Sequence, residues 1–282
     1  MDRAAYRQSS LDTWNALAPM WDERREQIAE PVTPVRDRML ELLSPHAGET
    51  LLDIACGSGE MTELASPLVG ASGRVICTDF AAQMVAAARR RGEQAGLANV
   101  EYREMDAEQM DLADASVDGV TCRFGYMLMT DRVAALRETR RVLRDDGRLV
   151  FAVWAEPMRN PWVLVPGSVL LERGLMPPPD PEGPGIFALG DRDKIHASLA
   201  AAGLAAAELS DVEIHHHSAD RETMWERITQ TMGPLATAIA EQPADEQASI
   251  RAAIEERAEA FRSDDGYHLP GAAYVVLAEP VI

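Results

Sequence analysis

Three acidic residues in the first half of the chain, Asp53, Asp79 and Asp106, end or closely follow short runs that are typical of β-strands. A carboxylate at such a position, Asp79 above all, can accept hydrogen bonds from both hydroxyl groups of a ribose. Each charge-assisted bond of this kind is worth about 1.5–3 kcal/mol. Asp106 can accept a hydrogen bond from the exocyclic amino group of adenine. The acids therefore predict a site for a ligand that contains adenosine.

A glycine loop, Ala55-Cys56-Gly57-Ser58-Gly59, connects the first of these runs to a predicted helix. Gly57 and Gly59 allow a sharp turn and a close ligand approach, and the helix N-terminus directs free N–H groups at the ligand. Enzymes that bind dinucleotides use a similar loop, but they place a third glycine where this chain has Thr62. A nicotinamide-dependent oxidoreductase is a remote alternative. A further alternative is that the two glycines only form a turn between strand and helix and bind no ligand.

Five segments resemble motifs of the class I S-adenosylmethionine-dependent methyltransferases. They are 52–59, Asp79-Phe80 with Met84, Asp106-Ala107, 115–118 leading into 123–125, and 143–149. The resemblance is to the ubiquinone/menaquinone C-methyltransferase-like group (methyltransferase type 11). It covers residues 10–155 well and 185–210 moderately. Signatures of the quinone-binding side are not evident, so the resemblance does not imply a quinone substrate.

The resemblance implies S-adenosylmethionine as the cofactor and assigns roles to the motif residues. The glycine loop and the acid before it would hold the methionine part, and the acid at the end of the second strand would hold the ribose. Phe80 and Met84 would enclose the adenine, and Arg123 would lie beside the sulfonium; packing in the core is the alternative for Phe80 and Met84. The expected cofactor-binding residues are Asp53, Ala55, Gly57, Gly59, Asp79, Phe80, Met84, Asp106, Ala107 and Arg123.

Apolar runs and helical periods alternate from residue 50 onward, which is typical of a parallel α/β sheet. We expect an α/β, Rossmann-like fold: a mostly parallel seven-stranded sheet with helices on both faces, an N-terminal helical extension, and a helical insertion before the last strand. The predicted strands are 50–55, 74–78, 100–103, 117–123, 148–154, 207–217 and 271–278, and the predicted helices of the sheet are 60–66, 81–95, 131–144 and 191–202.

The expected domain division is a helical extension or lid (1–47), a cofactor-binding domain (48–218 and 265–282), and two insertions (156–190 and 219–264). The first insertion is rich in proline and glycine and is predicted to be largely loop; the second is predicted to be helical. Ligands of open α/β sheets bind at the carboxyl ends of the strands, so both insertions should cover the substrate. The expected apolar cover consists of Trp154, Met158, Trp162, Phe187, Met224, Trp225 and Met232.

Methyl transfer from a sulfonium is an in-line displacement, for which positioning alone can supply about 7–11 kcal/mol. A general base is needed only if the acceptor must lose a proton. We therefore assign no catalytic residue; the weak candidates for a base are His268, Tyr126, Glu156 and His217. The expected substrate is a small, neutral, largely apolar molecule, methylated on carbon or oxygen. N-methylation of a small amine, and a protein that binds S-adenosylmethionine without methylating, are the alternatives.

The formal net charge of −19 argues against nucleic acid and anionic membranes as partners. No apolar run approaches the roughly 20 residues of a membrane span, and residues 1–10 lack a secretory signal, so we expect a cytoplasmic protein. A homodimer is left open. No metal is expected, because on a strand only His215 and His217 of the 215–217 run would share a face.

Overall fold

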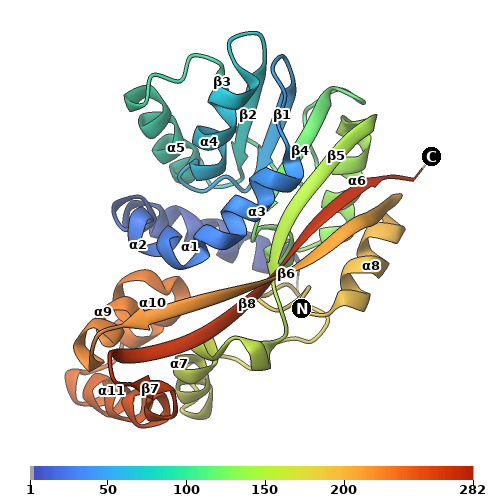
Figure 1. Ribbon diagram of the computed structural model, residues 1–282. Coiled ribbons are helices and arrows are strands. Elements are labelled where there is room, and N and C mark those ends of the chain that lie inside the picture. Colours follow the sequence, from blue (N-terminus) through green and yellow to red (C-terminus); the bar gives the residue numbers. More distant parts are fainter. Residues whose placement is uncertain (1–2, 282) are drawn as a thin grey trace.

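The computed structural model describes residues 3–281 and has a twisted sheet at its centre (Figure 1). Its strands are β1 (Thr50–Ile54), β2 (Arg74–Asp79), β3 (Val100–Glu104), β4 (Val117–Arg123), β5 (Leu143–Trp154), β6 (Leu204–Ser218), β7 (Arg262–Ser263) and β8 (Gly266–Pro280). They are ordered β3-β2-β1-β4-β5-β8-β6, and β7 pairs with β8 outside this path. The first five strands are parallel, whereas β8 is antiparallel to β5 and β6. The expected sheet is confirmed, with the two-residue strand β7 in addition to the seven predicted strands.

The central strands are apolar throughout because helices cover both faces of the sheet. In β1, Leu51, Leu52 and Ile54 are all at most 2% exposed, although neighbouring residues point to opposite faces. In Figure 1, α3 (Thr33–Leu43), α4 (Glu60–Val69) and α5 (Ala82–Gln94) lie on one face, and α6 (Arg132–Val142) and α8 (Arg192–Ala201) lie on the other. Of the helices in residues 3–281, none has the length and apolar character needed to cross a bilayer.

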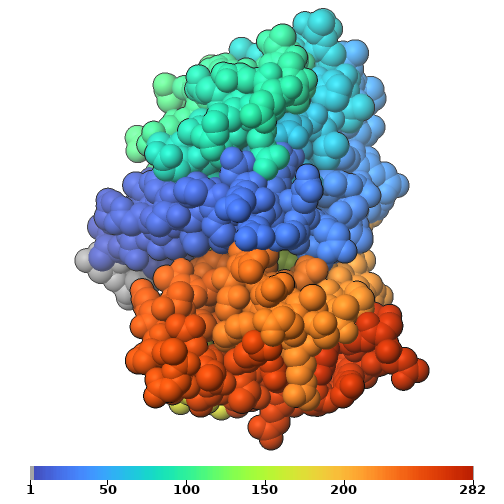
Figure 2. All heavy atoms as spheres, turned by 90° about the vertical axis from the view of Figure 1, so that its left-hand side faces the viewer, coloured from blue at the N-terminus to red at the C-terminus, as the bar shows by residue number. Residues whose placement is uncertain are grey.

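The N-terminal extension consists of α1 (Arg3–Glu23), α2 (Arg25–Ala29), a short 3-10 helix η1 (Glu30–Val32) and then α3. One side of α1 packs on the loop after β2 and on the start of α5. This contact is apolar and involves Leu11, Trp14, Ala18 and Trp21 on α1, and Phe80, Ala81 and Met84 opposite them. Figure 2 shows the N-terminal helices, in blue, as a band across the molecule.

A second hydrophobic core lies outside the main sheet and is built by four helices that we call the cap. These are α7 (Pro161–Glu172), α9 (Arg221–Thr231), α10 (Gly233–Ala240) and α11 (Ala244–Ala258), flanked by the 3-10 helices η3 (Pro157–Arg159) and η4 (Glu259–Phe261). The prediction that 156–190 is largely loop holds for residues 173–190 but is wrong for residues 161–172, which form α7. Pro161 lies at the first turn of α7, where its missing N–H costs no hydrogen bond.

Strands β6 and β8 carry the cap on a two-stranded extension that we call the arm (213–218 and 266–272). The last residue of β5, Trp154, pairs with Ala273, but β6 and β8 continue to pair as far as Ser218 and Tyr267. Strand β8 thus begins five residues before the predicted 271. The arm passes the carboxyl ends of the parallel strands and places the cap beyond that edge of the sheet (Figure 1).

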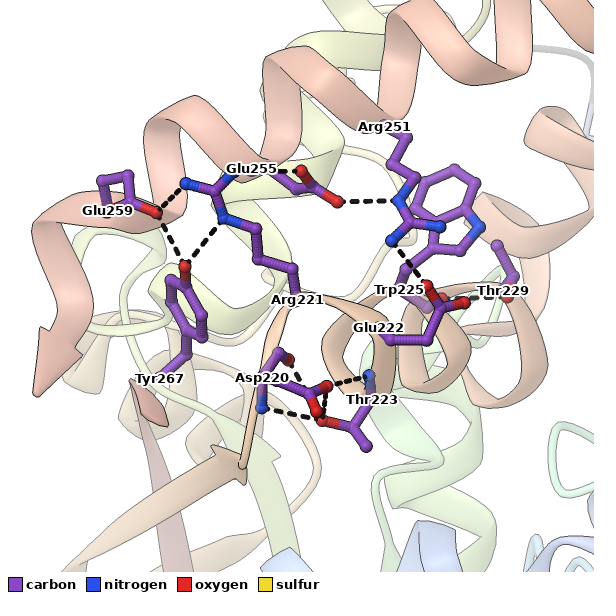
Figure 3. A network of polar contacts seen from close by, with 10 residues as sticks. All are labelled: Asp220, Arg221, Glu222, Thr223, Trp225, Thr229, Arg251, Glu255, Glu259 and Tyr267. Atoms are coloured by element: carbon purple, nitrogen blue, oxygen red, sulfur yellow. Dashed lines mark hydrogen bonds and ion pairs between the residues drawn. The ribbon is translucent and has the colours of Figure 1, made fainter. Parts of the chain in front are cut away.

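The outer surface of the cap is held together by polar contacts rather than by apolar ones (Figure 3). Arg221 of α9 donates to the Oη of Tyr267 on β8 at 3.0 Å and to Glu259 at 2.6 Å. Arg251 of α11 bonds Glu222 of α9 at 2.8 Å. These contacts tie both ends of the second insertion to the arm.

Candidate functional site

The glycine loop after β1 has the left-handed backbone that the sequence pattern predicts. Gly57 has φ +55° and Gly59 has φ +86°, and a Cβ atom on Gly59 would lie 3.0 Å from the Cβ of Ala88 in α5. Ala55 also has a positive φ, of +52°, which is rare for a residue with a side chain. The loop can therefore form only with glycine or a very small residue at these positions, and it leaves its backbone open to a ligand.

Asp79, at the end of β2, is hydrogen-bonded to this loop. Its Oδ2 accepts a hydrogen bond from the Gly57 N–H at 3.1 Å, and its Oδ1 accepts one from the Ala81 N–H at 3.0 Å. Burial raises the pKa of Asp79 to about 6, although these backbone donors act in the opposite direction. A carboxylate has about four acceptor positions, so Asp79 retains acceptor capacity for a ribose hydroxyl group.

Asp53 lies deeper than Asp79 and has a structural role. Its two oxygens accept hydrogen bonds from the hydroxyl groups of Thr121 on β4, at 2.8 Å, and of Thr62 on α4, at 2.7 Å. Burial raises its pKa, while the two threonines act to lower it. Asp53 thus fixes the distance between β1, β4 and the start of α4. Its expected contact with the methionine part of the cofactor stays a prediction.

The expected adenine residues lie beside a cavity of about 470 Å³ between α1 and the strand ends. Its walls include Ala4, Arg7, Gln8, Leu11, Phe80, Glu104, Met105 and Asp106. Met84 is only 2% exposed and lies in the core beneath Phe80, next to Ala81. Ala107 follows Asp106 and is partly buried against the main core. Phe80 and Asp106 therefore line the cavity, and Met84 supports its wall.

The N-terminal helix contacts the acidic edge of this cavity. Arg7 of α1 forms ion pairs with Asp106 and, at 3.3 Å, with Glu108. The N–H of Glu108 donates to the Oδ1 of Asp106 at 2.8 Å. Trp21, further along α1, lies near the glycine loop: its Nε1 would be 3.6 Å from a Cβ on Gly57. Helix α1 therefore packs on α5 and lies against several residues that are predicted to bind the cofactor.

Arg123, at the end of β4, lies in a charged cluster that the sequence analysis did not predict. One of its terminal nitrogens, Nη2, is 2.6 Å from the Oε2 of Glu60 in the first turn of α4, and Arg36 binds the other Glu60 oxygen at 3.2 Å. Burial acts to raise the pKa of Glu60, but Arg123 and Arg36 hold it below its ordinary value. The second terminal nitrogen of Arg123, Nη1, is buried without a hydrogen-bond partner.

An aromatic row begins directly after Arg123 and runs into the arm. Phe124, with φ +59°, stacks on Trp154 with ring centroids 4.4 Å apart. Trp154 is 4.8 Å from Trp162 of α7, which stacks on His216 of β6 at 4.5 Å. Since Phe124 directly follows β4 and His216 belongs to the arm, the row connects the parallel sheet to the cap.

His216 is the polar end of this aromatic row. Its ring is only 7% exposed, and its Nε2 is buried without a hydrogen-bond partner. Burial lowers the pKa of His216 to about 3, assisted by Arg227 and His215, so the ring is neutral at ordinary pH. Asn160 fixes the neighbouring Trp162 by accepting a hydrogen bond from its Nε1 at 3.0 Å. The sequence offered only one signal for this residue, namely that alternation on a strand points His216 away from His215 and His217.

The structure places the residues of the predicted cover in different environments. Trp154 and Trp162 belong to the aromatic row, and Phe187 packs against the main core. Met158, in contrast, is 83% exposed, so it covers nothing. Met224 is buried in the cap core, and Trp225 and Met232 pack against that core. Three of the expected cover residues therefore stabilise the cap itself.

The four weak candidates for a base do not form one group. Tyr126 is completely buried and its Oη hydrogen-bonds Thr139 at 2.7 Å, and burial raises its pKa. Glu156 accepts a hydrogen bond from Tyr274 at 2.7 Å. His217 and His268 lie together on the arm. A catalytic role for any of them stays a prediction.

Comparison with known proteins locates a family within the chain. The family described as "Methyltransferase domain" matches residues 52–151. The ubiquinone/menaquinone biosynthesis C-methyltransferase UbiE of Klebsiella pneumoniae is 38% identical over 115 residues, which are 40% of this chain and 46% of that protein. UbiE of Hahella chejuensis is 41% identical over 118 residues, 42% of this chain and 47% of that protein. The match thus spans about half the length of these relatives.

Solved structures share the fold over most of the chain. A candidate methyltransferase from Bacillus halodurans has a TM-score of 0.59 at 20% identity and covers 86% of this chain and 97% of its own. A geranyl diphosphate methyltransferase in complex with GPP and sinefungin has a TM-score of 0.53 at 19% identity. The match covers 89% of this chain and 78% of that protein. The solved structures thus show the shared fold, and residues 52–151 match a methyltransferase domain similar to that of the UbiE relatives.

Proposed function

We propose that this chain is an enzyme that transfers the methyl group of S-adenosylmethionine to a small, neutral, largely apolar molecule. The observation that carries the proposal is the convergence of the glycine loop, Asp79 and Asp106 at one edge of the sheet, within the matched domain. When bound, the cofactor supplies an electrophilic methyl group on a sulfonium.

The residues at this edge fit the cofactor by their chemistry. Asp79 retains acceptor capacity for the ribose, and Phe80 offers an aromatic wall for the adenine beside Asp106. The unpartnered Nη1 of Arg123 is a buried donor without an acceptor, which suits the carboxylate of the methionine part. Arg123 would then bind two carboxylates: that of Glu60 through Nη2 and that of the cofactor through Nη1.

The aromatic row supports an apolar acceptor. Gly125, next to Phe124, approaches the glycine loop so closely that a Cβ on it would lie 2.7 Å from the Cβ of Ala55. The row therefore begins beside the loop and presents Phe124, Trp154 and Trp162, none of which carries a charge. A charged acceptor against such a wall would lose hydration without gaining a partner. At the far end, the Nε2 of His216 can accept a hydrogen bond from a hydroxyl group of the acceptor.

The division of labour that we propose follows the domain boundaries. Residues 48–218 and 265–282 bind the cofactor, the N-terminal helices 1–47 cover it, and the insertions 156–190 and 219–264 form the substrate side. Because no residue in the row is charged, we attribute the rate to alignment of acceptor and methyl group and to exclusion of water. The net charge of −19 supports a small molecule rather than a nucleic acid as substrate, and we propose a cytoplasmic location.

The test is release of S-adenosylhomocysteine by the full chain in the presence of acceptor panels. We expect turnover with hydrophobic phenols, polyketides or prenylated compounds. N-methylation of a small amine is the second candidate, because aromatic rings and a negative protein field both favour a cation. Turnover of a small hydrophilic acid, with none on the apolar panel, would overturn the proposed substrate class.

A matched pair of variants separates the row from the cap. Trp162→Leu should reduce acceptor turnover more than about tenfold while cofactor affinity stays within about threefold, since Trp162 lies in the aromatic row. Trp225→Leu is the control, because Trp225 contacts the cap core and the guanidinium of Arg251 instead. Equal turnover in both variants would show that the aromatic row is not part of the substrate site.

A further inference from the structure

Two histidines and one aspartate meet at the outer end of the arm. His217 of β6 and His268 of β8 lie directly opposite each other in the antiparallel pairing, with ring centroids 4.6 Å apart. Asp265 lies in the turn between β7 and β8. One possible ligand atom from each of the three side chains lies within 4.8 Å of the other two. The site is accessible, since 42% of the His268 side chain and 70% of the Asp265 side chain are exposed.

This triad has the donor set of a divalent transition-metal site. Imidazole nitrogen and carboxylate oxygen are both good ligands of Zn²⁺, at about 2.0–2.2 Å. The donor atoms around such an ion lie about 3.4 Å apart in a tetrahedron, so only small side-chain rotations at this exposed position are required. The fourth position would be taken by water.

Hydrogen bonds already hold the three residues of the triad close together. The Nε2 of His268 is 2.8 Å from the Oδ1 of Asp265, and the Nε2 of His217 is 3.0 Å from the backbone oxygen of Asp265. The Ser263 hydroxyl group donates to the same Oδ1 of Asp265 at 2.7 Å, the kind of outer contact that orients a ligating carboxylate. Arg227 donates a hydrogen bond to the backbone oxygen of His217 at 3.3 Å.

The position of the triad gives it a structural consequence. His217 lies two residues before the insertion 219–264, which contains α9–α11, and Asp265 directly follows the insertion. An ion bound to both would close this long segment at its base. Closing a long loop removes conformational freedom from the open or unfolded cap, so bound metal would stabilise the cap on the arm.

We propose that His217, Asp265 and His268 bind a divalent metal ion of the zinc type, which clamps the two ends of the cap insertion. The proposal does not depend on the enzymatic activity, because its ligands lie on the arm and outside the cofactor site. The sequence placed only His215 and His217 on one face of a strand, which is too few ligands for a metal; the fold adds Asp265 and His268 beside His217.

The test uses the full chain, prepared without a histidine tag and stripped of metal, titrated with Zn²⁺ by calorimetry and with Co²⁺ by visible absorption. We expect one saturable site, and an absorption spectrum of Co²⁺ with nitrogen and oxygen ligands. His217→Ala and His268→Ala should each weaken binding by about 10–100-fold or more. His46→Ala is the matched control: His46 is also an exposed histidine next to an acid, Glu49, but it has no partner histidine.

A second measurement tests the clamp. Zn²⁺ should raise the unfolding temperature of the unmodified chain and of His46→Ala, but not that of His268→Ala, by the linkage between binding and stability. Since the triad residues are exposed, their replacement should leave the near-ultraviolet circular dichroism unchanged. Absence of a saturable site, or affinity that is equal in the control and the His217 and His268 variants, would overturn the proposal.

Discussion

The cofactor edge of the sheet and the cap use buried residues in opposite ways. At the cofactor edge, Asp53, Glu60 and Asp79 are buried carboxylates, each held by hydrogen bonds or ion pairs from neighbouring elements. In the cap, the buried residues are apolar, such as Ile250 and Ile254, and the charged residues lie on the outside. Buried carboxylates cost desolvation free energy, and they concentrate at functional sites. The difference supports our proposal that the chemistry takes place at the sheet edge, whereas the cap contributes shape.

The largest expected effect comes from truncating one core residue in each region. Leu52 of β1 and Ile254 of α11 are both completely buried, so Leu52→Ala and Ile254→Ala should each destabilise by about 2–5 kcal/mol in chemical unfolding. The cofactor should raise the unfolding midpoint of Ile254→Ala as much as that of the unmodified chain. In Leu52→Ala this shift should shrink, because Leu52 precedes Asp53 and supports the glycine loop. If the cofactor-induced shift shrank equally in both variants, the cap would belong to the cofactor site.

The next effect concerns the ribose contact. Asp79→Ala should weaken S-adenosylmethionine binding by roughly 2–4 kcal/mol, since it removes two charge-assisted hydrogen bonds to the ligand. Equilibrium binding by calorimetry measures the change. Asp111→Ala, an exposed acid of the loop that follows β3, serves as the control and should leave the affinity unchanged. If Asp79→Ala changed the dissociation constant by less than about threefold, with the fold intact, the ribose assignment would be wrong.

The pH dependence of cofactor binding should report the same carboxyl group. The pKa of Asp79 is raised to about 6 in the ligand-free protein, and only the ionised form can accept both ribose hydroxyl groups. The affinity for the cofactor should therefore reach its maximum above about pH 7. It should fall as the pH drops through 6 and be about tenfold weaker near pH 5. Asp79→Asn should show no such step. Constant affinity of the unmodified chain across this range would contradict the assignment.

The smallest effect is expected at Ala55. Its φ of +52° costs an L-residue about 1–2 kcal/mol, which glycine avoids, but glycine loses about 0.5–1 kcal/mol more conformational entropy on folding. Ala55→Gly should therefore stabilise the chain by at most about 1.5 kcal/mol and leave cofactor affinity unchanged. Thermal unfolding measures this difference, and a clear destabilisation would show that the Ala55 side chain contributes packing.

Local motifs made the cofactor edge predictable from the sequence. The glycine loop, Asp79 and Phe80 each lie at a strand end, and parallel strands bring their carboxyl ends to one edge whatever the loops between them do. Helix α7 was missed because the prolines of 156–190 suggested loop throughout. Pro161 in fact stands in the first turn of α7, and the apolar residues that follow it were the available signal.

Contacts between distant segments were not predictable in this way. The pairing of Arg123 with Glu60, of Arg7 with Asp106, and of Trp162 with His216 depends on how whole elements pack, and no spacing in the sequence encodes it. The same holds for the burial of Met224 in the cap and the exposure of Met158, which look alike as apolar residues. Periodicity can predict that a residue lies in an element, but not which other element it will contact.

Binding of radiolabelled S-adenosylmethionine to the full chain, with S-adenosylhomocysteine and NADH as competitors, tests the central claim most directly. The account predicts saturable binding at one site per chain, displaced by S-adenosylhomocysteine, unaffected by NADH, and lost in Asp79→Ala. Binding of NADH without binding of S-adenosylmethionine would contradict it, because the glycine loop and the acids at the sheet edge would then serve a dinucleotide.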